Sequence, residues 1–99
     1  MIQIIALLYA GEHGIDGLRE FESRVIPILR EHKGVLISAS SDLNREADAP
    51  DEIHVIQFPS LKEFEAYKID LRVTELSSLK AEMIRKMHTY TTNSFHQYF

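Results

Sequence analysis

The segment spanning residues 51–67, D-E-I-H-V-I-Q-F-P-S-L-K-E-F-E-A-Y, constrains the fold more than any other part of the chain. Residues 52–58 have the composition and alternation of a strand, and Pro59 ends it because proline lacks the N–H that a β-ladder needs. Ser60 and Glu63 then form the S-x-x-E capping box that marks a helix start. A strand that leads directly into a helix predicts a domain of mixed α and β structure.

Three other segments are rich in the β-branched, aromatic and large apolar residues that favour strands. They span residues 2–9, 34–40 and 89–95. The first is apolar on both of its alternating faces, so we expect it to be covered on both sides. The polar, turn-forming residues 41–51 predict an exposed hairpin loop between the second and third strands.

Two helical regions are predicted from apolar residues spaced three and four positions apart. The first runs from Asp16, its expected N-cap, to about His32, and Gly34 is expected to take the left-handed conformation that closes it. The second begins after Ser60 and is interrupted at residues 70–71. It then resumes on a stripe formed by Leu76, Leu79, Met83 and Met87.

The order of these elements is strand, helix, strand, strand, helix, strand, which predicts a ferredoxin-like α+β fold. We expect one domain over residues 1–99, with an antiparallel four-stranded sheet and both helical regions on one face. Right-handed crossovers place the first and third strands in the centre of the sheet.

Helices on one face leave the other face of the sheet open. We assign His54 to this open face, together with Ile5, Leu7, Tyr9, Ile56 and Phe58. An apolar patch of that size needs a cover, and the simplest cover is a second copy of the chain packed sheet to sheet. The sequence therefore predicts a homodimer that forms a dimeric α/β barrel.

Composition excludes several kinds of partner. The formal net charge of -4 argues against nucleic acid, because nucleic-acid binders concentrate Lys and Arg on one face. The short apolar run at residues 4–8 predicts no membrane span. Because the chain has no cysteine, thiol chemistry and disulfides are excluded, and we expect a cytoplasmic location.

Three segments carry a resemblance to a known group of proteins. They are F-E-S-R-V-I-P-I-L-R-E-H-K-G, D-E-I-H-V-I-Q-F-P-S and F-E-A-Y-K-I-D. They resemble a family of small domains of unknown function within the dimeric α/β-barrel superfamily, which contains the antibiotic-biosynthesis monooxygenases. The resemblance covers residues 2–93. The superfamily also includes cofactor-independent oxygenases, haem-degrading enzymes, lactone isomerases, chlorite dismutases and members without known activity, so the resemblance implies a fold but no single reaction.

His54 is the candidate catalytic residue, because an imidazole in an apolar strand is suited to act as a general acid or base. The alternative is a histidine that is hydrogen-bonded inside the interface for packing reasons. Five further side chains carry hydroxyl or guanidinium groups that could bind a substrate in the same cleft. They are Tyr9, Ser38, Tyr67, Arg72 and Tyr90.

The sequence favours chemistry without a metal or cofactor. The five histidines form no H-x-H or H-x-x-x-H pair, and no Gly-rich loop could hold a phosphate. The chain has no tryptophan, which the resemblance associates with the pocket of the haem-degrading members. Together with His54 in an apolar cleft, the resemblance implies a cofactor-independent monooxygenase or isomerase for a small aromatic or lactone-like molecule, and the alternative is a non-catalytic small-molecule-binding or interaction module.

Overall fold

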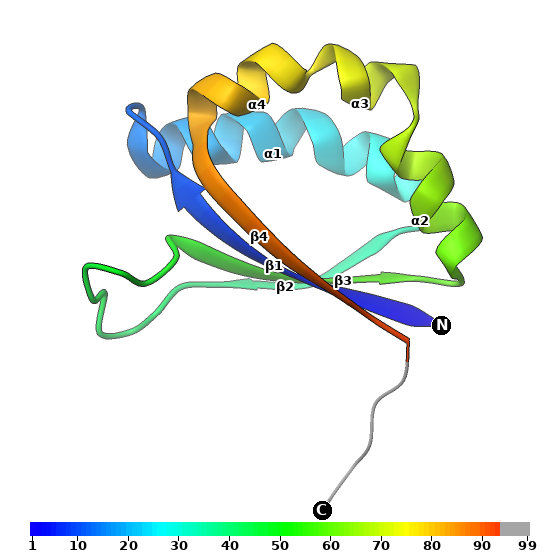
Figure 1. Ribbon diagram of the computed structural model, residues 1–99, viewed down its shortest axis with the longest axis horizontal. Helices are drawn as coiled ribbons and strands as arrows, with labels where there is room; N and C mark the ends of the chain where they lie inside the picture. The colour runs from blue at the N-terminus through cyan, green and yellow to red at the C-terminus, as the bar shows by residue number, and fades with distance from the viewer. Residues whose placement is uncertain (94–99) are drawn as a thin grey trace, which may run out of the picture.

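Four strands form an antiparallel sheet in the order β2-β3-β1-β4, and the helices lie together over one of its faces (Figure 1). The strands are β1 (Ile2–Ala10), β2 (Val35–Ser40), β3 (Glu52–Phe58) and β4 (Ile84–Thr92). The structure, a computed structural model, describes residues 1–93. The predicted ferredoxin-like fold is confirmed, with the first and third strands at the centre of the sheet. The predicted continuation of the last strand through residues 94–95 lies outside the described residues.

The helical layer consists of α1 between the first two strands and three shorter helices between the last two. The bounds are α1 (Gly14–Glu31), α2 (Leu61–Lys68), α3 (Leu71–Glu75) and α4 (Ser77–Met83). The stripe of α1 that the spacing predicts is buried, and it comprises Leu18, Phe21, Val25, Ile28 and Leu29. The predicted interruption is also present, because Asp70 ends one helical segment and caps α3 by accepting a hydrogen bond from the Arg72 N–H.

Both ends of α1 differ from the prediction. Asp16 is not the N-cap, since the helix starts at Gly14 after His13. The Asp16 carboxylate lies in the first turn instead, where its negative charge interacts favourably with the positive end of the helix dipole. Lys33 rather than Gly34 is left-handed, with φ of 67°. Gly34 is needed for close packing instead, because a Cβ there would lie 2.8 Å from the Phe58 ring.

The last strand begins five residues before its predicted start. Ile84 is buried and pairs with Ala10, and the ladder then continues along β1 as far as Gln3 and Thr92. Met87, predicted on the helical stripe, therefore lies in β4. The long first strand offers hydrogen-bonding partners along its whole length, and this tertiary pairing outweighs the helical spacing of the methionines.

The predicted face of His54 is wrong. Directly paired residues of neighbouring strands share a face, and the ladder pairs Ala6 with His54 and Ile2 with Phe58. Ala6, Ile2 and His54 are all buried under the helices. Ile56 and Phe58 therefore also lie on the helix-covered face, whereas Ile5, Leu7 and Tyr9 were placed correctly on the open face. Both faces of β1 are apolar, so alternation alone did not identify the face that the helices cover.

Candidate functional site

A cavity of about 390 Å³ lies between the helix-covered face of the sheet and the helices. We call it the inner cavity. Most of its lining is apolar, with Ile4, Ala6, Leu8 and Ile56 from the sheet and Phe21, Val25 and Phe64 from the helices. Its exposed lining residues include Ser77 on α4 and Met87 and Thr89 on the edge strand β4, which places the mouth between these two elements.

His54 stands in the wall of this cavity between two carboxylates. Its ring is 3 % exposed, its Nε2 lies 2.8 Å from Glu52 Oε1, and its Nδ1 lies 3.8 Å from Glu22 Oε2. Glu52 is two residues from His54 on β3, so the pleat places both side chains on one face. Glu22 comes from α1, next to the buried Phe21 that anchors this turn of the helix to the core.

The protein environment changes the acidity of two groups in the cavity. Burial raises the pKa of Glu22, and the Glu52 carboxylate adds to this effect, while His54 and Lys80 oppose it. Burial also raises the pKa of Tyr67 to about 12, with a smaller effect from Glu22. Tyr67 therefore keeps its hydroxyl proton at neutral pH, and Glu22 retains its proton to higher pH than an exposed glutamate.

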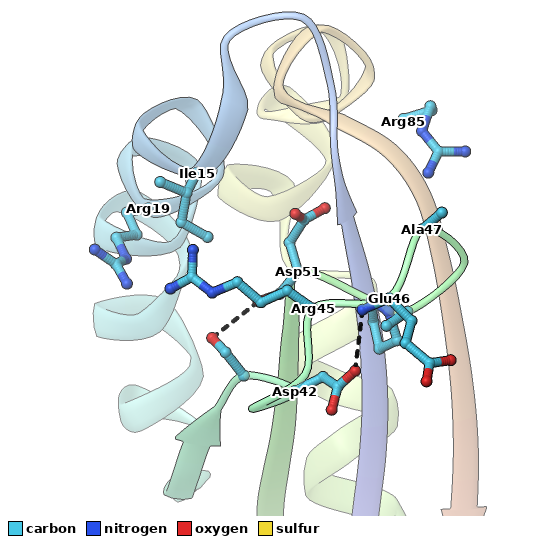
Figure 2. A pocket seen from close by; sticks show the side chains of 11 residues that line it. Ile15, Arg19, Asp42, Arg45, Glu46, Ala47, Asp51 and Arg85 are labelled. Carbon is cyan, nitrogen blue, oxygen red and sulfur yellow. Dashed lines mark hydrogen bonds between the residues drawn. The ribbon is translucent and has the colours of Figure 1, made fainter.

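Glu52 also has an exposed partner on α1. Arg19 of α1 donates from Nε to Glu52 Oε2 at 3.2 Å. The Arg19 side chain also lines a second pocket, of about 490 Å³, beside the loop between β2 and β3. Figure 2 shows this loop pocket, with Ile15 and Arg19 of α1 on one side and loop residues such as Asp42, Arg45 and Asp51 on the other.

The inner cavity contains two of the residues that the sequence predicted for a site, His54 and Tyr67. Tyr9, Ser38 and Tyr90 lie on the opposite, open face of the sheet. Ser38 pairs there with Val55, and Tyr90 pairs with Ile5. The sheet therefore separates these hydroxyl groups from His54, and the predicted single cleft is not formed within one chain.

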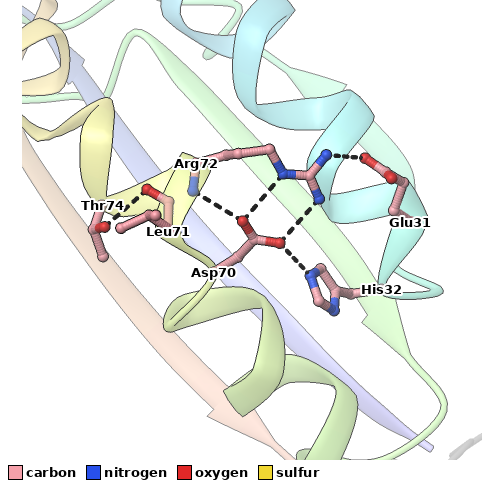
Figure 3. A network of polar contacts seen from close by, with 6 residues as sticks. All are labelled: Glu31, His32, Asp70, Leu71, Arg72 and Thr74. Atoms are coloured by element: carbon pink, nitrogen blue, oxygen red, sulfur yellow. Dashed lines mark hydrogen bonds and ion pairs between the residues drawn. The ribbon is translucent and has the colours of Figure 1, made fainter.

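Arg72 has a structural position on the surface rather than a place in the cavity lining. Its Nη1 lies 2.7 Å from Glu31 Oε2, and its Nη2 lies 3.0 Å from Asp70 Oδ2 (Figure 3). Asp70 also accepts a hydrogen bond from His32 Nε2 at 2.8 Å. This network ties the end of α1 to the junction between α2 and α3.

Sequence reasoning missed Glu22, Glu52 and Lys80. Glu52 had a detectable signal, because it precedes His54 by two residues and so shares its face in any strand. Glu22 and Lys80 had none, since a charged residue beside an apolar helical stripe is usually solvated, and only the packing of α1 on α4 brings both toward the cavity.

Metal ligation has no support in the part of the chain that the structure describes. Among residues 1–93, no three His, Asp or Glu side chains converge as a metal would require, although Glu22, Glu52 and His54 are neighbours. Within the same range, none of the helices has the length and apolar character needed to cross a bilayer.

Comparison with known proteins gives matches at the level of structure alone. No family model and no curated protein matches the chain. A protein of unknown function from Rhodopseudomonas palustris is similar in structure, with a TM-score of 0.80 and 11 % identity over 97 % of this chain and 83 % of that one. An antibiotic biosynthesis monooxygenase is similar with a TM-score of 0.69 and 13 % identity, over 97 % of this chain and 100 % of that one.

An uncharacterised NIPSNAP domain protein from Burkholderia xenovorans also matches, with a TM-score of 0.72 and 6 % identity over 96 % of this chain and 95 % of that one. At these identities the similarity establishes the fold. It confirms the predicted fold, which the antibiotic biosynthesis monooxygenase and the NIPSNAP domain protein share.

Proposed function

We propose that the chain is a cofactor-independent enzyme that moves protons on a small aromatic or lactone-like molecule bound in the inner cavity. The observation that carries the proposal is the position of His54, which lies between the carboxylates of Glu22 and Glu52 in an otherwise mainly apolar wall. A buried imidazole oriented by one carboxylate and facing another is an arrangement suited to general acid and base catalysis.

The contacts of the imidazole support a role for each group. Glu52 accepts the Nε2–H of His54, which leaves the lone pair of Nδ1 directed toward the cavity side, where Glu22 lies. Nδ1 takes a proton from a carbon next to a carbonyl, and the bonding electrons move to the carbonyl oxygen to form an enolate. The Tyr67 hydroxyl, which keeps its proton, donates a hydrogen bond to that oxygen.

Two outcomes follow from such an enolate. If protonated Glu22 returns a proton to a different carbon, the result is an isomer of the substrate. If dioxygen reacts at the carbon, a CH₂ group becomes a carbonyl, one oxygen atom stays in the product and the other leaves as water. Both outcomes need only the side chains present and, for the second, dissolved dioxygen.

The cavity also supports the substrate class. Its volume of about 390 Å³ lies within the range of small-molecule sites, roughly 300–1,000 Å³. Phe21 and Phe64 offer ring surfaces for an aromatic ligand, and Lys80 of α4 also lines the cavity. The monooxygenase named among the similar structures shares the fold that builds such a cavity.

The test compares two histidine variants on a panel of phenolic, polycyclic ketone and lactone compounds, with and without oxygen. His54→Gln should reduce turnover by about a hundredfold or more, the usual contribution of a positioned acid or base. His88→Gln is the matched control, because His88 is exposed on the opposite face of the sheet and should leave turnover unchanged.

The alternative is a binding module without chemistry. It would be supported if mass spectrometry found a ligand in the purified protein that the wild type binds but does not convert. If His54→Gln turns over the substrate at the wild-type rate, His54 is not the catalytic base.

A further inference from the structure

We propose that Glu52 is the outlet through which the proton on His54 exchanges with solvent, and that Arg19 is the positioning residue that holds this carboxylate. The inference deepens the proposed function, and its role in turnover rests on it. The geometry that carries it is a chain of three side chains that leads from the inner cavity to the loop pocket.

The two ring nitrogens of His54 face different surroundings. Nδ1 faces Glu22, whose side chain lines the inner cavity. Nε2 faces Glu52, whose side chain is not part of that lining. A proton gained on the cavity side at Nδ1 can therefore be balanced by release of the Nε2 proton on the other side of the ring.

Exposure increases along this chain. The side chain of His54 is 3 % exposed, that of Glu52 is 10 % exposed, and that of Arg19 is 64 % exposed. Arg19 lines the loop pocket, and Figure 2 shows its side chain at the side of the pocket formed by α1. One carboxylate thus separates the buried imidazole from a solvent-accessible surface.

An occupied cavity makes this outlet necessary. A ligand that fills the inner cavity displaces water from the Nδ1 side, where the neighbouring ionisable groups are Glu22, Lys80 and Tyr67. Glu22 is itself buried, and burial favours its protonated form, so it is a poor acceptor for a further proton. The remaining path leads from Nε2 to Glu52 Oε1 and then to water near Arg19.

Arg19 fixes the orientation of the outlet. Its Nε holds Glu52 Oε2 at 3.2 Å, which leaves Oε1 directed at the imidazole at 2.8 Å. Within residues 1–93, Arg19 is the only Lys or Arg side chain that forms an ion pair with Glu52. Because Arg19 is largely exposed, it can be replaced without leaving a hole in the core.

The experiment measures the rate at which the ring N–H of His54 exchanges with water, by ¹⁵N-resolved NMR on the intact protein without a substrate. Glu52→Gln keeps an oxygen that accepts the Nε2–H but cannot take up the proton, so exchange should slow by about a hundredfold or more, the usual contribution of a positioned base. Arg19→Gln should also slow exchange, and Arg19→Lys should partly restore it.

Arg24→Gln is the matched control. Arg24 lies on the same helix, and its Nη2 lies 2.9 Å from Glu20 Oε1, away from the proposed outlet, so its replacement should leave exchange at the wild-type rate. If Glu52→Gln does not fold, the surface variants Arg19→Gln and Arg19→Lys decide the question.

Wild-type exchange in a folded Glu52→Gln or in Arg19→Gln would overturn the proposal, and so would slowing seen only in Glu22→Gln, which would place the outlet at the cavity mouth. The measurement is independent of the proposed function because it needs no substrate. Slowed exchange in Glu52→Gln without any turnover of the wild type would support the outlet and contradict catalysis. Loss of turnover in His54→Gln with unchanged exchange in Glu52→Gln would support catalysis and contradict the outlet.

Discussion

At the scale of single residues, Glu22 couples the site to pH. Its raised pKa means that the folded protein holds the proton more tightly than the unfolded chain, so the free energy of unfolding falls as pH rises through the interval between 4.5 and the raised value. The glutamine in Glu22→Gln cannot ionise, so the variant does not have this fall in the free energy of unfolding. Relative to the wild type, the variant should therefore gain stability as pH increases from 4 to 8.

Urea denaturation at several pH values measures this difference. Glu20→Gln serves as the control, because Glu20 is exposed on the same helix and pairs with Arg24. A stability difference between Glu22→Gln and the wild type that stays constant across the pH range would contradict the assignment. The ionisable groups that face Glu22, namely His54, Glu52 and Lys80, remain in the variant.

The same residues show how far a sequence defines a site of this kind. His54 and Tyr67 could be selected as candidates because a lone imidazole in an apolar strand and a tyrosine on a helix are visible in the sequence. The neighbours of His54 could not all be selected. The face of His54 depends on strand register, and Glu22 and Lys80 reach it from helices whose placement depends on long-range packing.

At the scale of elements, the start of β4 can be tested with two substitutions. Ile84 is 6 % exposed and belongs to the core cluster with Leu8 and Leu18, whereas Met87 is 40 % exposed. Ile84→Ala should lower the free energy of unfolding by about 2–5 kcal/mol, the usual range for a buried aliphatic residue. Met87→Ala should cost clearly less, and denaturant titration compares them.

If the helix extended through Met87, as its spacing from Met83 suggests, Met87→Ala would lower the free energy of unfolding more than Ile84→Ala. The prediction failed there because the two methionines fit a helical stripe as well as they fit a helix followed by a strand. The strand Glu52–Phe58 was predicted with the observed bounds because Pro59 marks its end locally. Ser60 is the N-cap of α2 as predicted, but its hydroxyl contacts the Glu63 carboxylate and caps no backbone N–H, so the predicted capping box is not formed.

The junction of α1 with α3 depends on a second network. Hydrogen bonds from Arg72 and His32 hold the pKa of Asp70 below its usual 3.8. A lowered carboxylate pKa stabilises the fold above 3.8, and this contribution is lost as pH falls below that value. Asp70→Asn should therefore lower the melting temperature at pH 7, and the difference from the wild type should shrink below pH 3.8.

Thermal denaturation followed by circular dichroism at pH 7 and at pH 2.5 checks this. Thr74→Ala is a suitable control, since the Thr74 hydroxyl donates only to the Leu71 carbonyl and takes no part in the ion pairs (Figure 3). A melting difference of equal size at both pH values would show that the carboxylate charge of Asp70 is not the cause.

At the scale of the whole molecule, the open face of the sheet remains to be covered. It presents Ile5, Leu7 and Val55, which are partly exposed, and Val35 and Tyr90, which are 53 % and 54 % exposed. The helices all lie on the other face, so this apolar surface has no partner among residues 1–93 (Figure 1). We propose that a second copy of the chain covers it, sheet against sheet, as a homodimer.

Sedimentation equilibrium at micromolar concentration tests the dimer, with Leu7→Lys as the disrupting variant. A lysine at the centre of the face would bury an unpaired charge between the sheets, so the variant should be monomeric or bind its partner far more weakly. Leu43→Lys introduces the same charge at a loop position that is 94 % exposed and should remain dimeric.

Since Leu7 lies on the side of β1 away from the inner cavity, the exchange rate of the His54 ring proton should be the same in Leu7→Lys as in the wild type. A wild-type monomer would contradict the proposed assembly, and a monomeric Leu7→Lys with altered exchange would show that the dimer also shapes the cavity.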